Sequence, residues 1–340
     1  MQEYAPLAKH STMGLGGTAR YLSIVSTKEE VLYTVNRAKS LGVSTIMIGE
    51  GSNIVWKDEG YSGMVIVNKI IGKNILSEDS KEVIVDIGAG ENWDEVVAWT
   101  VEKKLRGIET LSLIPGTAGA TPVQNVGAYG GEISKVLISL EAYDTNRQEF
   151  VTISGEDCGF GYRTSIFKTS DKGRYYITSI RLVLSKGRPV GPYYESVQKY
   201  FDNHYIEDID VNALRLAVID IRNGKLPDPK LIPNNGSFFA NPIISNLQFN
   251  QLKLKYPDIK AWSAGADLTK VSGAWLIEQC GMRGIHDEQT GMSTWPGQAL
   301  VLINEKAKST ADLLTFKQKI VDAVNAKFGI NLVQEPELLP

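Results

Sequence analysis

The side chains that most often catalyse reactions without a cofactor are scarce in this chain. Three histidines, His10, His204 and His286, are scattered among 340 residues. Cys158 and Cys280 are far apart and form no CxxC pair, so neither a disulfide framework nor a thiolate zinc site is predicted. We therefore expect the chemistry to depend on other residue types or on an organic cofactor, without a metal.

Two glycine-rich segments could bring backbone N–H groups close to a ligand. Residues 49–53 (GEGSN) directly follow the β-rich run STIMI, although on their own they are more typical of a plain turn. Residues 114–130 (IPGTAGATPVQNVGAYG) contain four glycines, two prolines and three alanines with almost no charge. A solvated loop usually carries charge, whereas a segment packed against a flat apolar ligand does not. The second segment therefore predicts a binding surface.

Two other segments resemble known motifs only in part. Residues 14–19 spell G-x-G-x-x-A, but no β-rich run precedes them and no acidic residue follows at the required spacing. This context disfavours a Rossmann site, and no Walker A spelling occurs in the chain. Residues 234–242 (NNGSFFANP) place Ser237 between a glycine and two phenylalanines, without the G-x-S-x-G elbow or a nearby histidine. On local sequence, Ser237 fits a packed turn as well as a reactive site.

Hydrophobic periodicity indicates the elements that must position these segments. Thr27 and Glu30 form a possible capping box, and Asn92 and Asp210 are candidate N-caps. Helices are predicted over residues 27–41, 92–105, 210–224, 273–280 and 310–328. Strands are predicted over residues 44–48, 65–67, 83–87, 136–143, 175–184 and 299–303.

The Gly/Pro-rich stretch 185–192 is the best candidate for a domain boundary. We expect an α+β protein with two domains, 1–187 and 188–340, the first divided again near residues 70–80. The balanced composition, with a net charge of −3, disfavours nucleic-acid binding. No secretory signal and no apolar run long enough for a membrane span is evident, so we expect a cytoplasmic protein.

Six segments in this order and spacing resemble the UDP-N-acetylenolpyruvoylglucosamine reductase family, which comprises the UDP-N-acetylmuramate dehydrogenases. They are GEGSN, IPGTAGATPVQNVGAYG, FGYRTSIFK, KLPDPK, NNGSFFANP and EPEL. The resemblance covers nearly the whole chain. It implies a PCMH-type FAD-binding module, like that of vanillyl-alcohol oxidase, in two subdomains, plus a separate α+β substrate-binding domain.

The resemblance also implies roles for individual residues. The three positions that match catalytic residues are Arg163, Ser237 and Glu337. The positions that match FAD contacts are Gly49, Glu50, Gly51, Ser52, Asn53, Pro115, Gly116, Gly119, Gly127, Ala128, Tyr129, Gly130 and Ile177. The positions that match contacts to the UDP-sugar are Tyr194, Lys225, Asn241 and Gln298.

The implied reaction is reduction of the enolpyruvyl group of UDP-N-acetylenolpyruvoylglucosamine in peptidoglycan precursor synthesis. Hydride passes from NADPH to FAD and then to the substrate. Arg163 offers a cationic fork to the substrate carboxylate, Ser237 protonates the carbanion, and Glu337 donates a proton or orients Arg163. The absence of a histidine beside GEGSN in the sequence favours non-covalent FAD, and we expect a monomer.

Two departures and several alternatives accompany this prediction. Glu337 lies three residues from the end of the chain, and Ala240 stands where relatives can carry a lysine. Without the resemblance, Arg163 would read as a surface ion-pair partner, Lys225 as a solvated charge and Tyr194 as ordinary packing. The alternative functions are an FAD-dependent oxidase of the same fold and a nucleotide-sugar binding protein without flavin.

Overall fold

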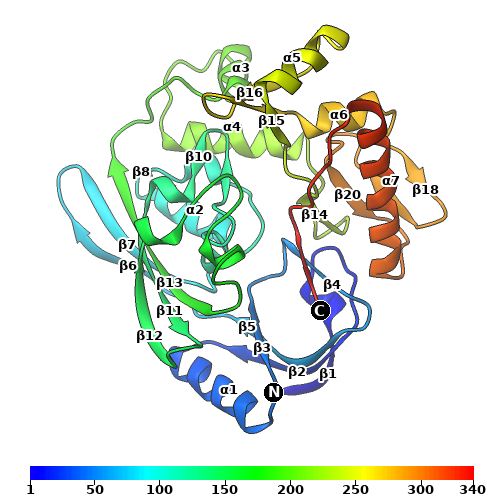
Figure 1. Cartoon of the computed structure of the whole chain (residues 1–340). Coiled ribbons are helices and arrows are strands. Elements are labelled where there is room, and N and C mark those ends of the chain that lie inside the picture. The colour runs from blue at the N-terminus through cyan, green and yellow to red at the C-terminus, as the bar shows by residue number, and fades with distance from the viewer. The chain divides into compact units, whose positions relative to one another are not determined.

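The computed structural model describes all 340 residues, which form two compact units (Figure 1). Unit 1 comprises Met1–Ala5, Ala19–Glu50 and Tyr61–Gly224. Unit 2 comprises Pro6–Thr18, Gly51–Gly60 and Lys225–Pro340. The chain therefore passes from one unit to the other inside the GEGSN segment, between Glu50 and Gly51.

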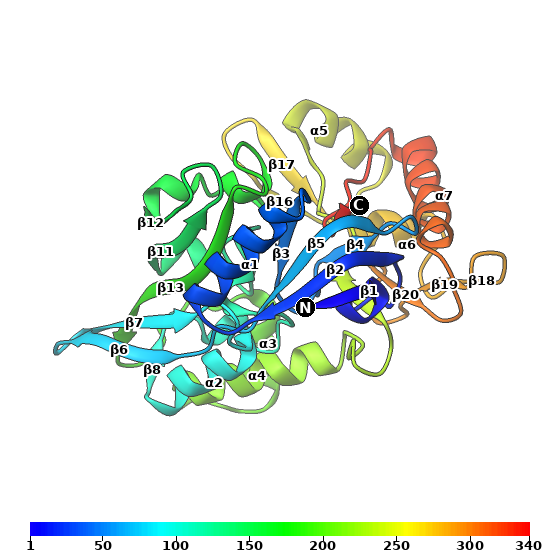
Figure 2. The same ribbon diagram turned by 90° about the horizontal axis from the view of Figure 1, so that it is seen from below.

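The first sheet of unit 1 has the strand order β1-β2-β5-β3. Its strands are β1 (Gln2–Pro6), β2 (Thr18–Val25), β3 (Thr45–Ile48) and β5 (Tyr61–Asn68), and β5 pairs in parallel with both β2 and β3. Helix α1 (Lys28–Ser40) lies beside this sheet (Figure 2) and buries Val31 and Ala38 in a shared core. The Thr27 hydroxyl accepts a hydrogen bond from Glu30 N and caps the helix.

The second sheet of unit 1 is antiparallel, with the order β12-β11-β13-β7-β6, and β8 also pairs with β13. Its strands are β6 (Lys73–Glu78), β7 (Glu82–Gly88), β8 (Leu105–Arg106), β11 (Leu137–Asp144), β12 (Glu149–Ser154) and β13 (Tyr175–Lys186). Helix α2 (Trp93–Glu102), capped by Asn92, contributes Trp93, Val96 and Val97 to the core of this sheet. A short hairpin, β9 (Gly127–Ala128) and β10 (Gly131–Glu132), precedes β11.

Helices α3 (Glu195–Asn203) and α4 (Val211–Asn223) complete unit 1 and pack on each other through Val197, Phe201 and Leu214. The Asp210 side chain accepts a hydrogen bond from Ala213 N and caps α4. The remaining elements of unit 1 are short 3-10 helices: η2 (Glu109–Leu111), η3 (Ala118–Ala120), η4 (Ile133–Lys135), η5 (Glu156–Cys158) and η6 (Ile166–Lys168).

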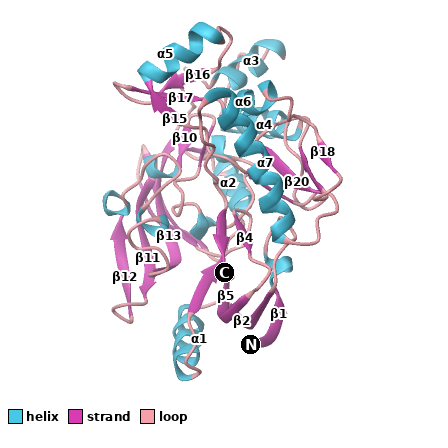
Figure 3. Cartoon of the chain, turned by 45° about the vertical axis from the view of Figure 1, so that its right-hand side comes forward, coloured by secondary structure: helices cyan, strands magenta, loops and turns pink.

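Unit 2 contains three small sheets around one apolar core. They are β14-β20-β19-β18 (Asn234–Ser237, Val301–Asn304, Met292–Thr294, His286–Asp287), β15-β17-β16 (Ile243–Ser245, Leu268–Val271, Ala261–Ser263) and the pair β4 (Ile54–Trp56) and β21 (Glu337–Leu339). Its helices are η1 (Leu7–His10), α5 (Asn246–Lys255), α6 (Gly273–Gln279) and α7 (Thr310–Phe328). Helix α7, which Figure 3 shows along one side of β20, buries Leu313, Phe316 and Ile320.

The predicted α+β class and the main helices and strands are confirmed, with shifts of a few residues at their ends. The rejection of a Rossmann site is also confirmed, because the chain after Gly14–Gly17 enters strand β2 and not a helix. The prediction omitted β1, β2, α3, α5, the terminal strand β21 and most of the short strands, among them β4, β6 and β14 to β19. The assignment of cofactor binding to 1–187 and substrate binding to 188–340 stays a prediction. No helix is both long and apolar enough to cross a membrane.

Candidate active site

Two of the segments that resemble flavin contacts meet each other in unit 1. Gly49 follows β3, and a Cβ atom built on it would lie 2.3 Å from Thr117 Oγ1. Gly119 approaches Ala89 equally closely, since its Cβ would lie 2.5 Å from the Ala89 Cβ. The Gly116 carbonyl accepts a hydrogen bond from the backbone N–H that begins α2. Only glycine permits these approaches, which hold the 115–119 loop against the ends of β3 and β7.

A tight hairpin presents the second half of the same segment. Gly127 pairs with Glu132 and Ala128 with Gly131, while Tyr129 and Gly130 form the turn. Their φ angles of 48° and 85° are both positive, which is the backbone of a type I′ turn. A Cβ on Gly130 would meet no atom within 4 Å, so the turn leaves one open face.

Arg163 is hydrogen-bonded to this hairpin. Its Nη2 donates a hydrogen bond to the Gly127 carbonyl at 2.7 Å, and its guanidinium lies 5.6 Å from the centre of the Tyr162 ring. A Cβ on Gly127 would come within 3.4 Å of Arg163 Nη1. Arg163 also has a φ of 55°, a conformation that is uncommon for residues other than glycine. The structure thus brings the predicted catalytic arginine next to the predicted flavin hairpin.

Tyr194 meets the same hairpin from the start of α3. Its ring contacts the Tyr129 ring edge to face, with centroids 5.7 Å apart and planes at 88°. The Tyr194 side chain is still 45% exposed, so part of it remains accessible to a ligand. Burial raises the pKa of both phenols above the usual value, and both hydroxyls stay protonated at neutral pH.

A network of charges in unit 1, which the sequence analysis missed, supports Tyr129. Arg222 lies beside the Tyr129 phenol and near the Asp94 carboxylate, and burial lowers the pKa of its guanidinium. Asp94 accepts two hydrogen bonds from Arg215, at 2.7 and 2.9 Å, and a third from Leu113 N at 2.6 Å. No motif distinguishes these charges from ordinary surface residues of helices. The positions of Arg215 and Arg222 on one predicted helix, about two helical turns apart, are the one signal that suggests a shared face.

Gly51, Ser52 and Asn53 of the GEGSN segment lie in unit 2, against the N-terminal segment. Gly51 has a φ of 75°, and a Cβ on it would lie 2.1 Å from the His10 carbonyl oxygen. Thr12 N donates to the Gly51 carbonyl at 3.1 Å, and the Ser11 hydroxyl donates to the Ile54 carbonyl at 2.8 Å. This part of the predicted flavin segment is therefore held by residues 10–12, which the sequence analysis did not assign to the site.

Ser237 ends strand β14 and pairs with Val301 of β20. It follows Gly236, whose φ of 68° accompanies an irregularity in the strand pairing. The next two side chains, Phe238 and Phe239, are completely buried, whereas Ser237 itself is half-buried. The phenylalanines anchor the segment in the core and leave the serine at its edge.

The C-terminal tail lies beside the segment that follows Ser237. Its residues pair first with the segment after Ser237, through Ala240 N to the Val333 carbonyl and Glu335 N to the Phe238 carbonyl. Glu337 then begins β21, which runs parallel to β4 (Figure 1), and its N–H donates to the Asn53 carbonyl at 2.9 Å. Unit 2 thus brings Ser237, Glu337 and Asn53 onto adjoining backbone segments, and the tail is docked.

The residues predicted to contact the UDP-sugar fall into three places. Tyr194 is in unit 1, as described above. Lys225 and Gln298 meet in unit 2 at one turn, where the Lys225 carbonyl accepts from Trp295 Nε1 and the Trp295 carbonyl accepts from Gln298 N. Asn241 uses its side-chain oxygen to hold the first turn of α6, through Gly273 N at 2.9 Å.

The last predicted flavin contacts, Glu50 and Ile177, lie in unit 1. The Glu50 carboxylate forms an ion pair with Lys69 at 3.6 Å. Ile177 is buried in β13, where its carbonyl accepts a hydrogen bond from Asn68 Nδ2 at 2.8 Å. Asn68 ends β5, so this bond connects the two sheets of the unit.

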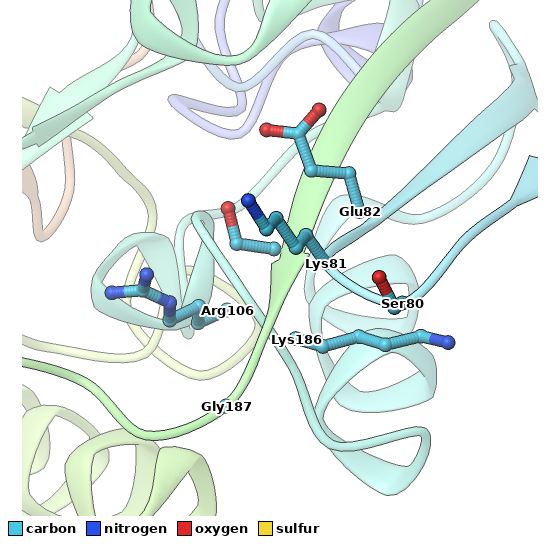
Figure 4. A pocket seen from close by; sticks show the side chains of 7 residues that line it. Ser80, Lys81, Glu82, Arg106, Lys186 and Gly187 are labelled. Atoms are coloured by element: carbon cyan, nitrogen blue, oxygen red, sulfur yellow. The ribbon is translucent and has the colours of Figure 1, made fainter.

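A surface pocket of about 390 Å³ in unit 1 contains none of the predicted site residues. It is lined mainly by charged side chains at the edge where β7, β8 and β13 meet, and Figure 4 shows Arg106 and Lys186 pointing in opposite directions. The Lys186 ammonium forms an ion pair with the Glu78 carboxylate at 2.6 Å. Arg106 and Lys186 therefore do not converge on one point of this pocket.

The glycine approaches, the open turn at Gly130 and the neighbouring phenols fit a flavin, which needs backbone donors and flat apolar contacts. No group of three or more His, Cys, Asp or Glu side chains is placed to hold a metal ion. The buried Asn235 has a side-chain oxygen without a hydrogen-bond partner in the protein.

Comparison with known proteins identifies both parts of the chain. Residues 19–154 match the family model of an FAD binding domain, and residues 228–339 match that of the UDP-N-acetylenolpyruvoylglucosamine reductase C-terminal domain. Reductases of this name from Cupriavidus pinatubonensis and Alcanivorax borkumensis are 37% and 39% identical to the chain. Each alignment covers 99% of this chain, and 98% and 95% of those relatives.

A solved structure has the same fold. The UDP-N-acetylenolpyruvylglucosamine reductase from Thermus caldophilus superposes with a TM-score of 0.67 at 24% identity, over 99% of this chain and 98% of that one. At this identity the match shows the fold alone. It agrees with the α+β architecture described above.

Proposed function

Because the chain belongs to the UDP-N-acetylenolpyruvoylglucosamine reductase family, we propose that it reduces the enolpyruvyl group of UDP-N-acetylenolpyruvoylglucosamine to give UDP-N-acetylmuramate, with NADPH as reductant. The chain is an oxidoreductase with an FAD-binding domain. When bound, FAD supplies the hydride carrier between NADPH and the substrate. The observation that supports the assignment best is the set of adjoining backbone segments in unit 2 that carry Ser237, Glu337 and residues 51–53 (GSN).

The residues proposed to act on the substrate carry complementary chemistry. Reduction of the double bond places negative charge on the carbon next to the carboxylate, and the charge spreads into that carboxylate. Arg163 would bind the carboxylate with its planar, permanently charged fork. Ser237 would give its proton to the carbanion, which is a strong enough base to accept a proton from a hydroxyl.

Glu337 is proposed to orient Arg163 or to donate a proton. Its backbone is fixed by strand pairing, because β21 pairs in parallel with β4 over Glu337–Leu339. The side chain then projects from an element that is anchored at both Asn53 and Lys57. A carboxylate on a fixed strand keeps its geometry better than one on a frayed terminus.

The UDP-sugar is proposed to contact Tyr194, Lys225, Asn241 and Gln298. Tyr194 would cover the diphosphate with its exposed part, and Lys225 would supply a compact positive charge. FAD is proposed to be non-covalent and to lie on Gly49–Asn53, Pro115, Gly116, Gly119, Gly127–Gly130 and Ile177. A cytoplasmic location and a monomeric state stay predictions.

The test is a reaction of the FAD-loaded protein with NADPH and UDP-N-acetylenolpyruvoylglucosamine, followed by mass spectrometry of the product. The proposal expects a product heavier by the two added hydrogens and a matching consumption of NADPH. Oxygen consumption without a reduced sugar product would favour the oxidase alternative. Tight UDP-sugar binding by a colourless preparation would favour the binding-protein alternative.

A further inference from the structure

Asn235 is a buried amide two residues before Ser237. The side chain is 6% exposed and lies in strand β14 of unit 2. Its Nδ2 is 3.0 Å from Thr12 Oγ1, 3.2 Å from the Ser52 carbonyl oxygen and 3.3 Å from the Ile54 carbonyl oxygen. One side chain thus connects the strand of the proposed proton donor with the segment after Gly51.

The chemistry of these partners fixes the orientation of the amide. The Ser52 and Ile54 carbonyls can only accept hydrogen bonds, so an NH2 group must face them. With the opposite orientation, the Asn235 oxygen would face two carbonyl oxygens and both attractions would become repulsions. The amide therefore acts as a donor toward the Ser52–Ile54 segment.

The other end of the same amide indicates why its donor bonds matter. Asn235 Oδ1 is buried and has no hydrogen-bond partner in the protein. Burial of an unpaired acceptor costs free energy, which an apolar side chain of similar size would avoid. An amide at this position is favourable only if its two N–H groups, shared among the three acceptors, do more than fill space.

Backbone hydrogen bonds around Asn235 also link the Ser237 strand to the segment after Gly51. Asn234 N donates to the Thr12 carbonyl at 2.9 Å, and Thr12 N donates to the Gly51 carbonyl. On the other side of the same loop, the Asn53 carbonyl accepts from Glu337 N. The segment 51–54 therefore lies between the strand that carries Ser237 and the strand that carries Glu337.

We propose that Asn235 is a positioning residue, whose amide ties the Ser237 strand to the Ser52–Ile54 segment and so holds the serine hydroxyl in reach of the substrate carbon. This inference rests on the role proposed for Ser237. Asn235 itself does not take part in proton transfer; it acts through the geometry of its strand. Loss of the amide should slow protonation without changing how the protein accepts hydride.

The test compares Asn235→Ala with the parent holoenzyme in two anaerobic half-reactions. We expect flavin reduction by NADPH to stay within about 2-fold of the parent, and flavin reoxidation by UDP-N-acetylenolpyruvoylglucosamine to slow by about 100-fold, the effect of a misplacement near 1 Å. The solvent deuterium isotope effect on reoxidation should rise, because proton donation becomes slower. Hydrogen exchange of the holoenzyme should become faster in residues 51–57.

A second variant and a control keep the result interpretable. Thr12→Val keeps the volume of the side chain but removes one acceptor of the Asn235 amide, so it should shift reoxidation in the same direction by a smaller factor. Val31→Ala, in the buried face of α1, lowers stability in a core of unit 1 that contains none of these residues, and both half-reactions should match the parent.

Two outcomes would overturn the inference. If Asn235→Ala slows both half-reactions equally, or neither, Asn235 does not position Ser237. If the parent enzyme itself is not reoxidised by the substrate, the proposed function fails first and the inference fails with it. The parent measurement therefore separates the two failures.

Discussion

Arg163 Nη2 donates a hydrogen bond to the carbonyl oxygen of Gly127 at 2.7 Å. The two residues are 36 positions apart and come from two of the segments that carry the family resemblance. Because Gly127 belongs to the hairpin proposed to contact FAD, this hydrogen bond links the proposed carboxylate clamp directly to that hairpin. A change of side chain at Arg163 should thus disturb the geometry of the hairpin as well as the charge.

We predict that Arg163→Lys keeps the positive charge but loses the planar fork and the bond to Gly127. Flavin reoxidation by the substrate should slow by about 100-fold, as expected when one preorganised donor is removed. Stopped-flow absorbance of the flavin measures this rate. Arg37→Lys, an exposed change on α1, is the matched control, and equal rates in the two variants would remove Arg163 from the proposed mechanism.

We predict that Ser237→Ala is reduced by NADPH at the parent rate but is reoxidised by the substrate about 100- to 10,000-fold more slowly, the usual contribution of a general acid. Ser263→Ala, at an exposed position of the same unit, should behave like the parent. Equal loss in both half-reactions would show that Ser237 has a different role.

Glu337→Gln should slow substrate reduction while FAD retention stays unchanged, because the backbone bond to Asn53 does not involve the side chain. Activity and the ratio of flavin to protein absorbance measure the two effects. Glu288→Gln, at an exposed position, is the control. Full turnover in Glu337→Gln would contradict a catalytic role for this residue.

Deletion of residues 334–340 tests the docking of the tail. It removes β21 and with it the parallel pairing to β4, the strand that follows the GSN residues. We expect substrate reduction to be damaged more than FAD retention, as measured by the same two assays. Loss of FAD equal to the loss of activity would indicate that the tail serves chiefly to hold the GSN loop.

The elements of this fold differ in how far the sequence determines them. Thr27, Asn92 and Asp210 each cap the helix that their local spacing predicts, because a capping bond spans three residues. The docking of Glu337 beside Asn53 depends on pairing between strands at opposite ends of the chain, which no local pattern encodes.

The candidate site shows the same difference. The motif segments identified the glycines and Ser237, but their supports, Asn235 and Thr12, act through contacts that exist only after folding. The charge network of Asp94, Arg215 and Arg222 was missed for the same reason. Charged side chains on a predicted helix usually face solvent, and their burial depends on the neighbouring elements.

Tyr194→Ala should raise the KM for the UDP-sugar by about 2- to 10-fold, the worth of an edge-to-face aromatic pair, with a smaller change in kcat. Tyr194→Phe keeps the ring against Tyr129 and should recover the part of the loss that is due to packing. Tyr33→Ala, on the exposed face of α1, is the control. An unchanged KM in Tyr194→Ala would contradict contact with the substrate.

Asp94→Asn should destabilise the protein at neutral pH by about 1.5–3 kcal/mol, the range for hydrogen bonds to a charged group. Burial alone would raise the pKa of Asp94, but the bonds from Arg215 and Leu113 N outweigh it and hold the pKa below the usual value. A lowered carboxyl pKa stabilises the fold above the unfolded value of about 4, and this contribution is lost as the pH falls through the folded pKa.

Urea unfolding of the parent and Asp94→Asn at several pH values checks this sign. The difference between the two should be largest near neutral pH, should begin to shrink below about pH 4, and should vanish once the pH is below the folded pKa of Asp94. Asp202→Asn, at an exposed position of α3, is the control and should match the parent throughout. A difference between parent and Asp94→Asn that does not depend on pH would contradict the assigned role of the carboxylate.

The central claim is that the protein passes hydride from NADPH to the enolpyruvyl group of the UDP-sugar, and an anaerobic titration of the flavin absorbance tests it most directly. NADPH should bleach the yellow absorbance of the FAD-loaded protein, and UDP-N-acetylenolpyruvoylglucosamine should then restore it without oxygen. A flavin that stays bleached after addition of this substrate, and recovers only when air is admitted, would contradict the account.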